Sequence, residues 1–236
     1  MHRFYAPDIE TALTLPEEES QHAVRVLRLK EGDEIEVVDG KGTMFKCSIT
    51  LAHSKHCAVE VEEQIVMQPH WGAKLVIGVA PTKNLDRVEW LAEKCTEMGI
   101  DRLIPLRCRY SERKELKTER LQKIMVSAMK QSLKAVLPQL DEMMLVRDVI
   151  EMPFDGQKFI CYCDDSVERR LLSKEYTPSV DALILIGPEG DFSKEEVDLA
   201  LKNGFVPVSL GDSRLRTETA AVAACFTCHT IKQIRE

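Results

Sequence analysis

Apolar and polar positions alternate along the first 70 residues in a way that predicts a small β-rich domain. A period of two is typical of a strand that buries one face. The segment Asp39-Gly40-Lys41-Gly42 separates two of these runs and has the composition of a tight hairpin. The expected elements are strands over 34–38, 44–51 and 57–62 and a short helix over 20–29. Together they predict a barrel-like domain over residues 1–70.

After residue 74 the pattern changes, and short apolar runs alternate with amphipathic stretches at helical spacing. This order of elements predicts an α/β domain with a parallel sheet over 73–236. Gly99 ends the first expected helix, and the capping box Ser193-Lys194-Glu195-Glu196 opens the third. The strands are expected over 75–80, 100–106, 159–163, 183–186 and 206–210, and the helices over 84–98, 118–137, 193–203 and 217–234. The segment 68–72, with its proline and glycine, is expected to link the two domains.

Charge is distributed unevenly along the chain. Its formal net charge of −7 argues, taken as a whole, against a polyanionic partner. Yet the segment 102–134 holds ten Lys and Arg against three Glu. Because local potential steers phosphate, this segment is a candidate RNA-binding surface. The composition of this segment is explained equally well if its Lys and Arg side chains are simply exposed to solvent on a loop and on one face of a helix.

Two apolar strands near the C-terminus each end in a glycine turn that is followed by a helix. Gly187-Pro188-Glu189-Gly190 follows the strand over 183–186, and Gly211 follows the strand over 206–210. Ligands of open α/β sheets gather where strands end and helices begin, so the two turns predict a small-molecule site. The sequence contains no dinucleotide fingerprint or Walker A motif, which disfavours an oxidoreductase or an ATP site. A plain strand-to-helix turn is the alternative for the tetrapeptide.

The segment Leu215-Arg216-Thr217-Glu218-Thr219 lies between the second glycine turn and a helix of small residues. Capping of that helix by Thr217 is an ordinary structural role. Capping does not require the neighbouring Arg216, however, so the segment favours a functional interpretation.

The eight cysteines are expected to be reduced thiols, several of them in the core. Cys225-Phe226-Thr227-Cys228-His229 matches the attachment pattern of c-type haem, but it lies inside an expected helix and we expect no secretory signal. Helical spacing puts Cys225 and Cys228 on one face, as core residues. Cysteine and histidine spacings suggest no zinc site, so no metal is expected. No apolar run is long enough to span a membrane, and we expect a cytoplasmic protein.

The glycine motifs also carry a resemblance to a known family. The segments 186–190 and 215–220 read Ile-Gly-Pro-Glu-Gly and Leu-Arg-Thr-Glu-Thr-Ala. The opening His2-Arg3-Phe4, the stretch 22–29 and a helix that ends in Glu97-Met98-Gly99 agree with them. In these features the chain resembles, nearly from end to end, the RsmE family of ribosomal RNA uridine N3-methyltransferases in the SPOUT superfamily.

The resemblance implies a PUA-like barrel at the N-terminus and a C-terminal domain with a deep trefoil knot that binds S-adenosylmethionine. It also implies a homodimer and a substrate in 16S ribosomal RNA of the small subunit. The implied cofactor-binding residues are Ile186, Gly187, Glu189, Gly190, Leu210, Gly211, Leu215, Arg216, Thr217 and Thr219.

Methylation of uridine N3 requires its anion to be aimed at the sulfonium methyl group. Arg216 is expected to stabilise the developing negative charge, and Glu218 or Glu189 to accept the proton. For Glu218, a favourable contact with the helix dipole is an equally good interpretation. The expected RNA-binding residues are Arg3, Arg25, Arg28, Lys83, Arg107, Arg109, Arg113 and Lys134.

Three positions depart from the family pattern. Asp191 stands where glycine is expected, and Asp212 stands where proline is expected. Both flank the expected cofactor loops. Lys134 replaces an arginine, which keeps the charge but loses the planar fork that suits phosphate.

Two other functions are compatible with this resemblance. One is a different SPOUT activity, such as methylation of a ribose 2′-hydroxyl in transfer or ribosomal RNA. The other is an RNA-binding protein without catalytic activity. Arg216, Thr217 and Glu218 argue against the second, because a pure binding protein does not need an intact cofactor loop.

Overall fold

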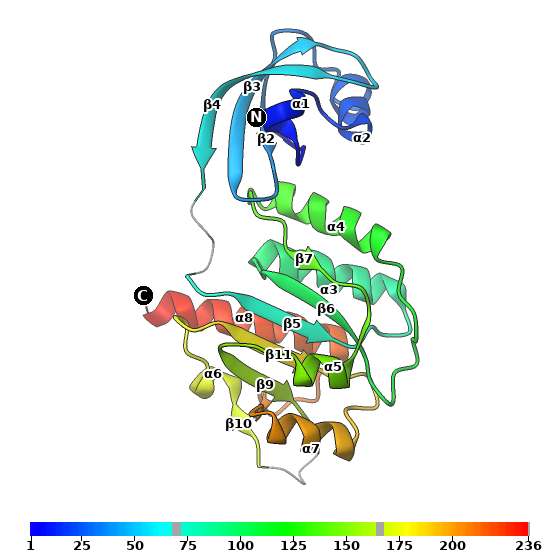
Figure 1. Cartoon of the computed structure of the whole chain (residues 1–236), viewed down its shortest axis with the longest axis vertical. Coiled ribbons are helices and arrows are strands. Elements are labelled where there is room, and N and C mark those ends of the chain that lie inside the picture. Colours follow the sequence, from blue (N-terminus) through cyan, green and yellow to red (C-terminus); the bar gives the residue numbers. More distant parts are fainter. Residues whose placement is uncertain (68–71, 164–167, 236) are drawn as a thin grey trace. The chain divides into compact units, whose positions relative to one another are not determined.

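The computed structural model describes residues 1–67, 72–163 and 168–235 (Figure 1). The chain divides into two compact units, Met1–His70 with Val126–Leu137, and Trp71–Met125 with Pro138–Glu236. The predicted domains, 1–70 and 73–236, differ from these units in the segment 126–137. Apart from Gly72, the predicted linker 68–72 lies outside the described residues.

The first unit is built on a four-stranded sheet in the order β1–β2–β3–β4. Its strands are β1 (His2–Tyr5), β2 (Glu34–Val38), β3 (Thr43–Leu51) and β4 (Ala58–Val66). The parallel pairing of β1 with β2 adds an N-terminal strand to an otherwise antiparallel sheet. The three predicted strands of this unit are therefore confirmed, and β1 is an addition that the pattern did not indicate.

The predicted hairpin between β2 and β3 is confirmed. Gly40 has a φ of +76°, a conformation that glycine adopts without strain. The Asp39 carboxylate oxygen Oδ1 accepts hydrogen bonds from the backbone N–H groups of Lys41 (2.7 Å) and Thr43 (2.9 Å). The side chain of Asp39 thus holds the turn that fixes the register of the two strands.

The single α-helix predicted over 20–29 is wrong. The structure has two short helices, α1 (Ile9–Ala12) and α2 (Glu17–Gln21), followed by a π-helix, η1 (His22–Val26). In η1 the backbone N–H of Leu27 donates to the carbonyl of His22 (3.0 Å), five residues earlier. Arg28 then adopts a φ of +58°, which ends the helical path. The widened turn keeps Ala23 fully buried.

The second unit contains a parallel sheet in the order β10–β12–β9–β11–β5–β6–β7, with β8 also paired to β6. Its strands are β5 (Leu75–Val79), β6 (Arg102–Arg107), β7 (Gln139–Leu140), β8 (Met144–Leu145), β9 (Gln157–Cys161), β10 (Arg170–Leu171), β11 (Ala182–Ile186) and β12 (Val206–Ser209). Its helices are α3 (Leu85–Met98), α5 (Val146–Glu151), α6 (Leu172–Glu175), α7 (Lys194–Lys202) and α8 (Thr217–Arg235), and α4 (Thr118–Gln131) begins in this unit and ends in segment 126–137 of the first. The predicted α/β class is confirmed, and the five predicted strands exist with small shifts at their ends.

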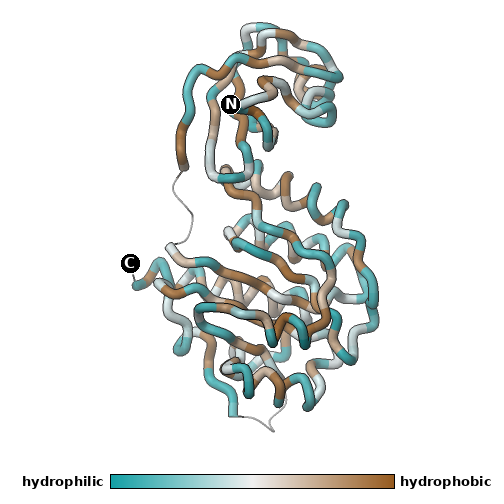
Figure 2. Tube along the Cα trace, in the orientation of Figure 1, coloured by the Kyte–Doolittle hydropathy of each residue, from teal (hydrophilic) through white to brown (hydrophobic). Residues whose placement is uncertain are grey.

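The core of this unit lies on both faces of the central strands β5 and β11, which are buried along their whole length. Apart from Gly78, their residues are hydrophobic (Figure 2). Alternate side chains of a strand point to opposite faces. Leu183 and Leu185 pack in one cluster with Val149 of α5 and Val197 of α7, so α5 and α7 cover that face. Helix α8 contacts β5, β11 and α3 and covers the other face.

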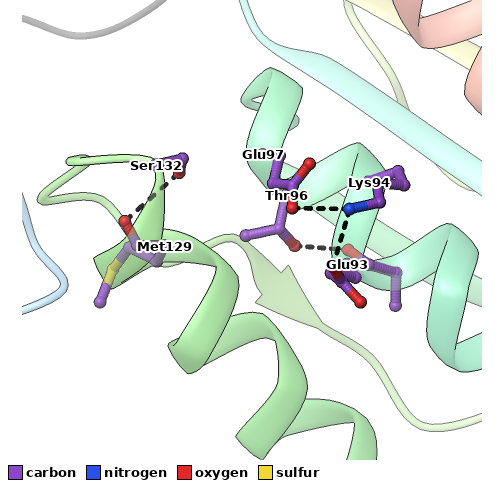
Figure 3. Close-up of polar contacts among 7 residues, drawn as sticks. Glu93, Lys94, Thr96, Glu97, Met129 and Ser132 are labelled. Carbon is purple, nitrogen blue, oxygen red and sulfur yellow. Dashed lines mark hydrogen bonds and ion pairs between the residues drawn. The ribbon is translucent and has the colours of Figure 1, made fainter.

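Two helix starts match the sequence signals. The side chain of Asn84 accepts a hydrogen bond from the backbone N–H of Asp86 and caps α3, which ends at Gly99 (φ +100°). The predicted capping box of α7 is confirmed in full, with Ser193 and Glu196 bonded to one another's backbone N–H groups. On α3, Lys94 also bridges two neighbouring glutamates at 2.7 and 2.8 Å (Figure 3).

Helix α4 is shorter than predicted. We expected it to continue to Leu137, but it ends at Gln131. Ser132 donates a hydrogen bond to the carbonyl of Met129 (3.3 Å; Figure 3), and Leu133 has a φ of +59°. The residues that follow bond to the hairpin of the first unit instead. Gly42 N–H donates to the carbonyl of Ala135, and the N–H of Leu137 donates to the carbonyl of Gly40.

No helix among the described residues is both long enough and apolar enough to cross a membrane. The knotted threading implied by the resemblance stays a prediction.

Removal of the Ser20 hydroxyl is expected to destabilise the first unit. Ser20 is fully buried, donates to the carbonyl of Leu15 (2.9 Å) and accepts from the N–H of Cys57 (2.9 Å). Ser20→Ala leaves both backbone groups buried without a partner, and we expect a loss of about 1–3 kcal/mol in urea unfolding. Ser48→Ala on β3, at a half-buried position, is the control, with an expected change below about 0.5 kcal/mol. Equal effects of the two substitutions would contradict this role for Ser20.

Candidate functional site

A cavity of about 970 Å³ opens in the second unit where β9 and β12 end and where the chain leaves β11. Because these three strands are parallel neighbours, the loops that follow them meet at the same edge of the sheet. Segments 190–194 and 208–215 form much of the wall, and Tyr110 reaches it from the loop after β6. The edge predicted from the glycine turns therefore carries a real cavity.

The predicted cofactor-binding residues fall into two groups. Gly190, Leu210, Gly211 and Leu215 line the cavity. The other six, outside the lining, are Ile186, Gly187 and Thr217, which are buried, and Glu189, Arg216 and Thr219, which are exposed. The Thr217 hydroxyl donates a hydrogen bond to the carbonyl of Gly187 (3.1 Å). This buried bond joins the start of α8 to the loop after β11, so the two cofactor loops predicted from sequence are physically connected.

Asp191 takes the conformation that explains why glycine was expected at its position. Its φ is +63°, in the left-handed region that aspartate tolerates better than most residues. One carboxylate oxygen accepts from the backbone N–H of Cys163 (2.9 Å), and the other accepts from that of Phe192 (2.8 Å). The side chain therefore ties the loop after β11 to the end of β9, which a glycine does not do.

A side chain at Gly190 would crowd Tyr110. A Cβ atom there would lie 3.1 Å from the Cβ of Tyr110, closer than most real contacts. The absent side chain lets the loop after β6 approach the loop after β11. Tyr110 thereby becomes part of the cavity wall, with about half of its surface exposed (52%).

The two predicted catalytic residues point to different surroundings. Arg216 is exposed at the start of α8, next to Leu215 in the cavity wall. Glu218 is only 7% exposed, and its Oε1 lies 3.6 Å from Nε of Arg87 on α3. The other oxygen of Glu218 is buried without a hydrogen-bond partner among the described residues. Glu218 thus contacts α3 and does not line the cavity, and Arg87 is a partner that the sequence did not indicate.

Cysteine thiols in the cavity wall are unsuited to nucleophilic catalysis. Burial raises the pKa of Cys161 far above its ordinary value. The pKa of Cys163 is raised as well, first by burial and then by the negative charge of Asp191. Both thiols therefore stay protonated at neutral pH, whereas the thiolate is the reactive form.

The predicted core positions of Cys225 and Cys228 are confirmed, since both are fully buried. In the described part of the chain no group of three His, Cys, Asp or Glu side chains is placed to hold a metal ion.

Several lining residues were not predicted, among them Tyr110, Cys161, Cys163, Arg169, Asp212 and Arg214 as cofactor contacts. Arg169 donates to the carbonyls of Tyr162 (3.2 Å) and Cys163 (3.0 Å) and so closes the end of β9. A signal for this wall existed in the sequence. A strand over 159–163 was predicted from its apolar residues, and its carboxyl end lies at the same edge.

The eight predicted RNA-binding residues occupy different settings. The Arg3 guanidinium pairs with Glu36 at 2.6 Å, and its side chain is only 9% exposed. Arg113 donates to the carbonyls of Thr82 (3.1 Å) and Lys83 (2.6 Å). Arg3 and Arg113 therefore have structural partners inside the protein. The remaining six are Arg25, Arg28, Lys83, Arg107 and Arg109, which are exposed, and Lys134, which is half-buried.

Charged groups of both signs surround the cavity. Glu168, Asp191 and Asp212 supply carboxylates, and Arg169, Lys194 and Arg214 supply cations. Such a mixture suits a ligand that carries both an amino group and a carboxylate. The approachable backbone at Gly190 and Gly211 suits a flat heterocycle that binds through main-chain groups.

Comparison with known proteins agrees with this geometry. The family model described as RNA methyltransferase domain matches residues 69–229, and the model described as RNA methyltransferase PUA domain matches residues 15–62. The chain is similar to a solved structure from Porphyromonas gingivalis, a probable rRNA-methyltransferase, with 44% identity, complete coverage of both chains and a TM-score of 0.95.

Two further relatives are more distant in sequence. A structure of ribosomal RNA small subunit methyltransferase E from Neisseria gonorrhoeae, bound to S-adenosyl methionine, is 26% identical, with 98% of this chain and 97% of that chain covered and a TM-score of 0.87. The protein of the same name from Rickettsia conorii is 28% identical over 203 residues, which are 84% of this chain and 81% of the relative. The resemblance found in the sequence is thereby confirmed, as is a PUA-type N-terminal domain. Since an RNA methyltransferase model matches well over half of its residues, the chain belongs to the RNA methyltransferase family, among the relatives of ribosomal RNA small subunit methyltransferase E.

Proposed function

We propose that this protein uses S-adenosylmethionine to methylate N3 of a uridine in 16S ribosomal RNA of the small subunit, in the cytoplasm. The observation that carries the proposal is the cavity at the ends of β9, β11 and β12, in a chain of this family. Its relative from Neisseria gonorrhoeae is described as bound to S-adenosyl methionine. Relatives from Rickettsia conorii and Bacillus subtilis carry the name ribosomal RNA small subunit methyltransferase E, which supports the substrate.

The residues present fit this cofactor. A volume of about 970 Å³ lies at the upper end of the range for small-molecule sites, roughly 300–1,000 Å³. We assign contacts with the cofactor to Gly190, Leu210, Gly211 and Leu215, and a supporting role to Ile186, Gly187 and Thr217 behind them. Glu189 and Thr219 are exposed on the same two loops and are assigned to its rim. Asp212 and Arg214 are suited to the amino and carboxylate groups.

When bound, the cofactor supplies an electrophilic methyl group and takes the electron pair of the broken carbon–sulfur bond. The uracil N3–H loses its proton, and the N3 lone pair forms the new bond to carbon. Arg216 stabilises the negative charge that develops on uracil O2 and O4, as fixed cationic donors do. Glu189, exposed beside Gly190, is better situated than Glu218 to receive the proton.

We assign Glu218 a positioning role, because its carboxylate is paired with Arg87 on α3. That pair fixes the first turn of α8, and therefore the direction of Arg216 two residues earlier. We also propose that the protein acts as a homodimer. Large apolar side chains exposed on neighbouring helices, Trp90 (41%) on α3 and Phe226 (58%) on α8, support a second copy as their cover.

The function predicts two measurable results. Calorimetry is expected to show saturable binding of S-adenosylmethionine to the protein. Incubation with small ribosomal subunits that lack the modification is expected to add one methyl group to a uracil base, detected by mass spectrometry of the digested RNA. A methyl group on ribose would overturn the assignment to N3, and an absence of binding heat would overturn the cofactor.

Loss of Arg216 is expected to impair the chemical step and leave cofactor binding intact. For Arg216→Ala we expect a fall of about 100-fold in single-turnover methylation, the size of effect seen when one charge-stabilising donor is removed. Arg216→Lys is expected to recover part of the rate. Arg170→Ala, at an exposed arginine outside the cavity wall, serves as the control. Near-normal turnover of Arg216→Ala would remove this residue from the mechanism.

Two substitutions of Asp191 distinguish the effect of its hydrogen bonds from the effect of its backbone conformation. Asp191→Gly tolerates the left-handed φ but loses both carboxylate bonds, and we expect about tenfold weaker binding of S-adenosylmethionine by calorimetry. Asp191→Ala loses the same bonds and is strained in addition. It is expected to unfold in urea with about 1 kcal/mol less stability than Asp191→Gly. Wild-type affinity in both variants would show that the tie to Cys163 does not shape the cavity.

A further inference from the structure

The structure sorts the basic residues of segment 102–134 by what they contact. Arg102 pairs with Asp141 at 2.5 Å, and Arg120 pairs with Glu89 at 2.7 Å. In the first unit, Lys130 pairs with Glu19 at 2.5 Å. Arg113 is bonded to two backbone carbonyls. These cations have partners within the protein, so the whole segment does not act as one RNA-binding surface.

Three of the other cations, Arg107, Arg109 and Lys114, surround a second cavity of about 360 Å³. A fourth cation in its wall, Arg147, comes from α5, outside the segment 102–134. Ser111 adds a hydroxyl to the lining. Every residue of the lining belongs to the second unit.

Strand pairing and hydrogen bonds between segments distant in sequence bring these side chains together. Arg107 at the end of β6 lies in register with Leu145 of β8, and Arg147 follows Leu145 by two residues. Beyond β6 the chain turns back, with the Ser111 hydroxyl accepting from the N–H of Cys108 (3.0 Å). The backbone N–H of Arg109 donates to Glu196 at the start of α7 (2.7 Å). Both sides of the cavity are therefore held by hydrogen bonds of the scaffold.

The charges in this cavity are poorly neutralised. Its one lining carboxylate, Glu196, already accepts the backbone N–H groups of Arg109 and Ser193. Arg147 has a loose, exposed pair with Glu151 at 3.4 Å, and Arg109 has one with Glu195 at 3.8 Å. In the described residues, Arg107 and Lys114 have no carboxylate partner. Two of the four cations have only loose carboxylate partners and two have none among the described residues, which favours an anionic ligand.

The second cavity shares two walls with the cofactor cavity. In the loop after β6, Tyr110 lines the cofactor cavity and its neighbours Arg109 and Ser111 line the second one. At the start of α7, Ser193 and Lys194 line the first and Glu196 lines the second. The two cavities are therefore neighbours on the same part of the second unit.

We propose that the cavity formed by Arg107, Arg109, Lys114 and Arg147 binds a backbone phosphate of the RNA next to the methylated nucleotide. This assignment rests on the proposed function. The planar guanidinium groups of three arginines and the ammonium group of Lys114 surround this small cavity, and such donors suit the oxygens of a phosphodiester. Tyr110, half exposed between the two cavities, is placed to stack on a base of the same strand.

The test compares pocket variants with charge-matched controls on the full-length protein. Lys114→Gln is matched by Lys202→Gln, an exposed lysine at the far end of α7. Arg147→Gln is matched by Arg170→Gln, an exposed arginine with a similarly loose carboxylate partner at 3.3 Å. Binding of deproteinised 16S ribosomal RNA is measured over a range of KCl concentrations, with melting curves to verify the fold and calorimetry to verify binding of S-adenosylmethionine.

We expect each pocket variant to bind this RNA about five- to tenfold more weakly than its control. The slope of log K against log salt should fall by about 0.7–0.9 for each phosphate that the variant no longer neutralises, while affinity for S-adenosylmethionine stays the same. Arg147→Lys is expected to recover part of the affinity.

Equal RNA affinity and equal slopes in pocket variants and controls would overturn the proposal. Saturable binding of inorganic phosphate at this cavity, with an unchanged RNA slope, would overturn the assignment to RNA. This test of the phosphate site and the test of the proposed function can fail independently. If wild-type protein binds RNA through this cavity yet adds no methyl group, the catalytic assignment fails and the phosphate site stands.

Discussion

The architecture of the second unit depends on one constraint. Strand β9 lies between β11 and β12 and is parallel to both, so the loops that follow the three strands begin at the same edge of the sheet. Three loops that leave one edge form a cavity only if they are held in fixed positions relative to one another. Asp191 ties the loop after β11 to the end of β9, and Thr217 ties the same loop to the start of α8. The bond between Asp191 and Cys163 lies in the cavity wall, and the bond between Thr217 and Gly187 lies behind it, so both bonds hold the shape of the cavity.

Pairing within the protein decides which positive charges remain for a ligand. Arg3 and Arg102 have carboxylate partners, and Arg113 has backbone partners, so their charges serve the fold. Arg107 and Lys114 have no carboxylate partner among the described residues and converge on one small cavity with Arg147. An acidic protein is thus able to present a local phosphate site, because the electrostatic potential in a cavity depends on the nearest charges and not on the net charge of the chain.

The two cavities, proposed to bind the cofactor and an RNA phosphate, share the loop after β6 and the start of α7 as walls. Glu196 participates in the capping box of α7 and also holds the loop after β6, so the wall between the cavities is rigid at both ends. Protonated thiols at Cys161 and Cys163 leave no cysteine nucleophile in the wall. This agrees with the proposed direct transfer of a methyl group from the cofactor to a base, in which we assign charge stabilisation to Arg216.

By itself, the sequence determined the elements whose signals are local. The hairpin at Asp39, the capping box at Ser193 and the buried strands β5 and β11 follow from turn chemistry, side-chain oxygens and apolar runs. The motifs around Gly187 and Arg216 indicated the family and the edge of the sheet that carries the cavity. Only the tertiary structure decided the rest, because the deciding partners are distant in sequence. Helix α4 ends early, and residues 135–137 bond to the β2–β3 hairpin. Glu218 pairs with Arg87, and the register of β8 on β6 brings Arg147 near Arg107. The spacing of residues in the sequence does not indicate such contacts, because they depend on how distant strands and helices pack in the folded chain.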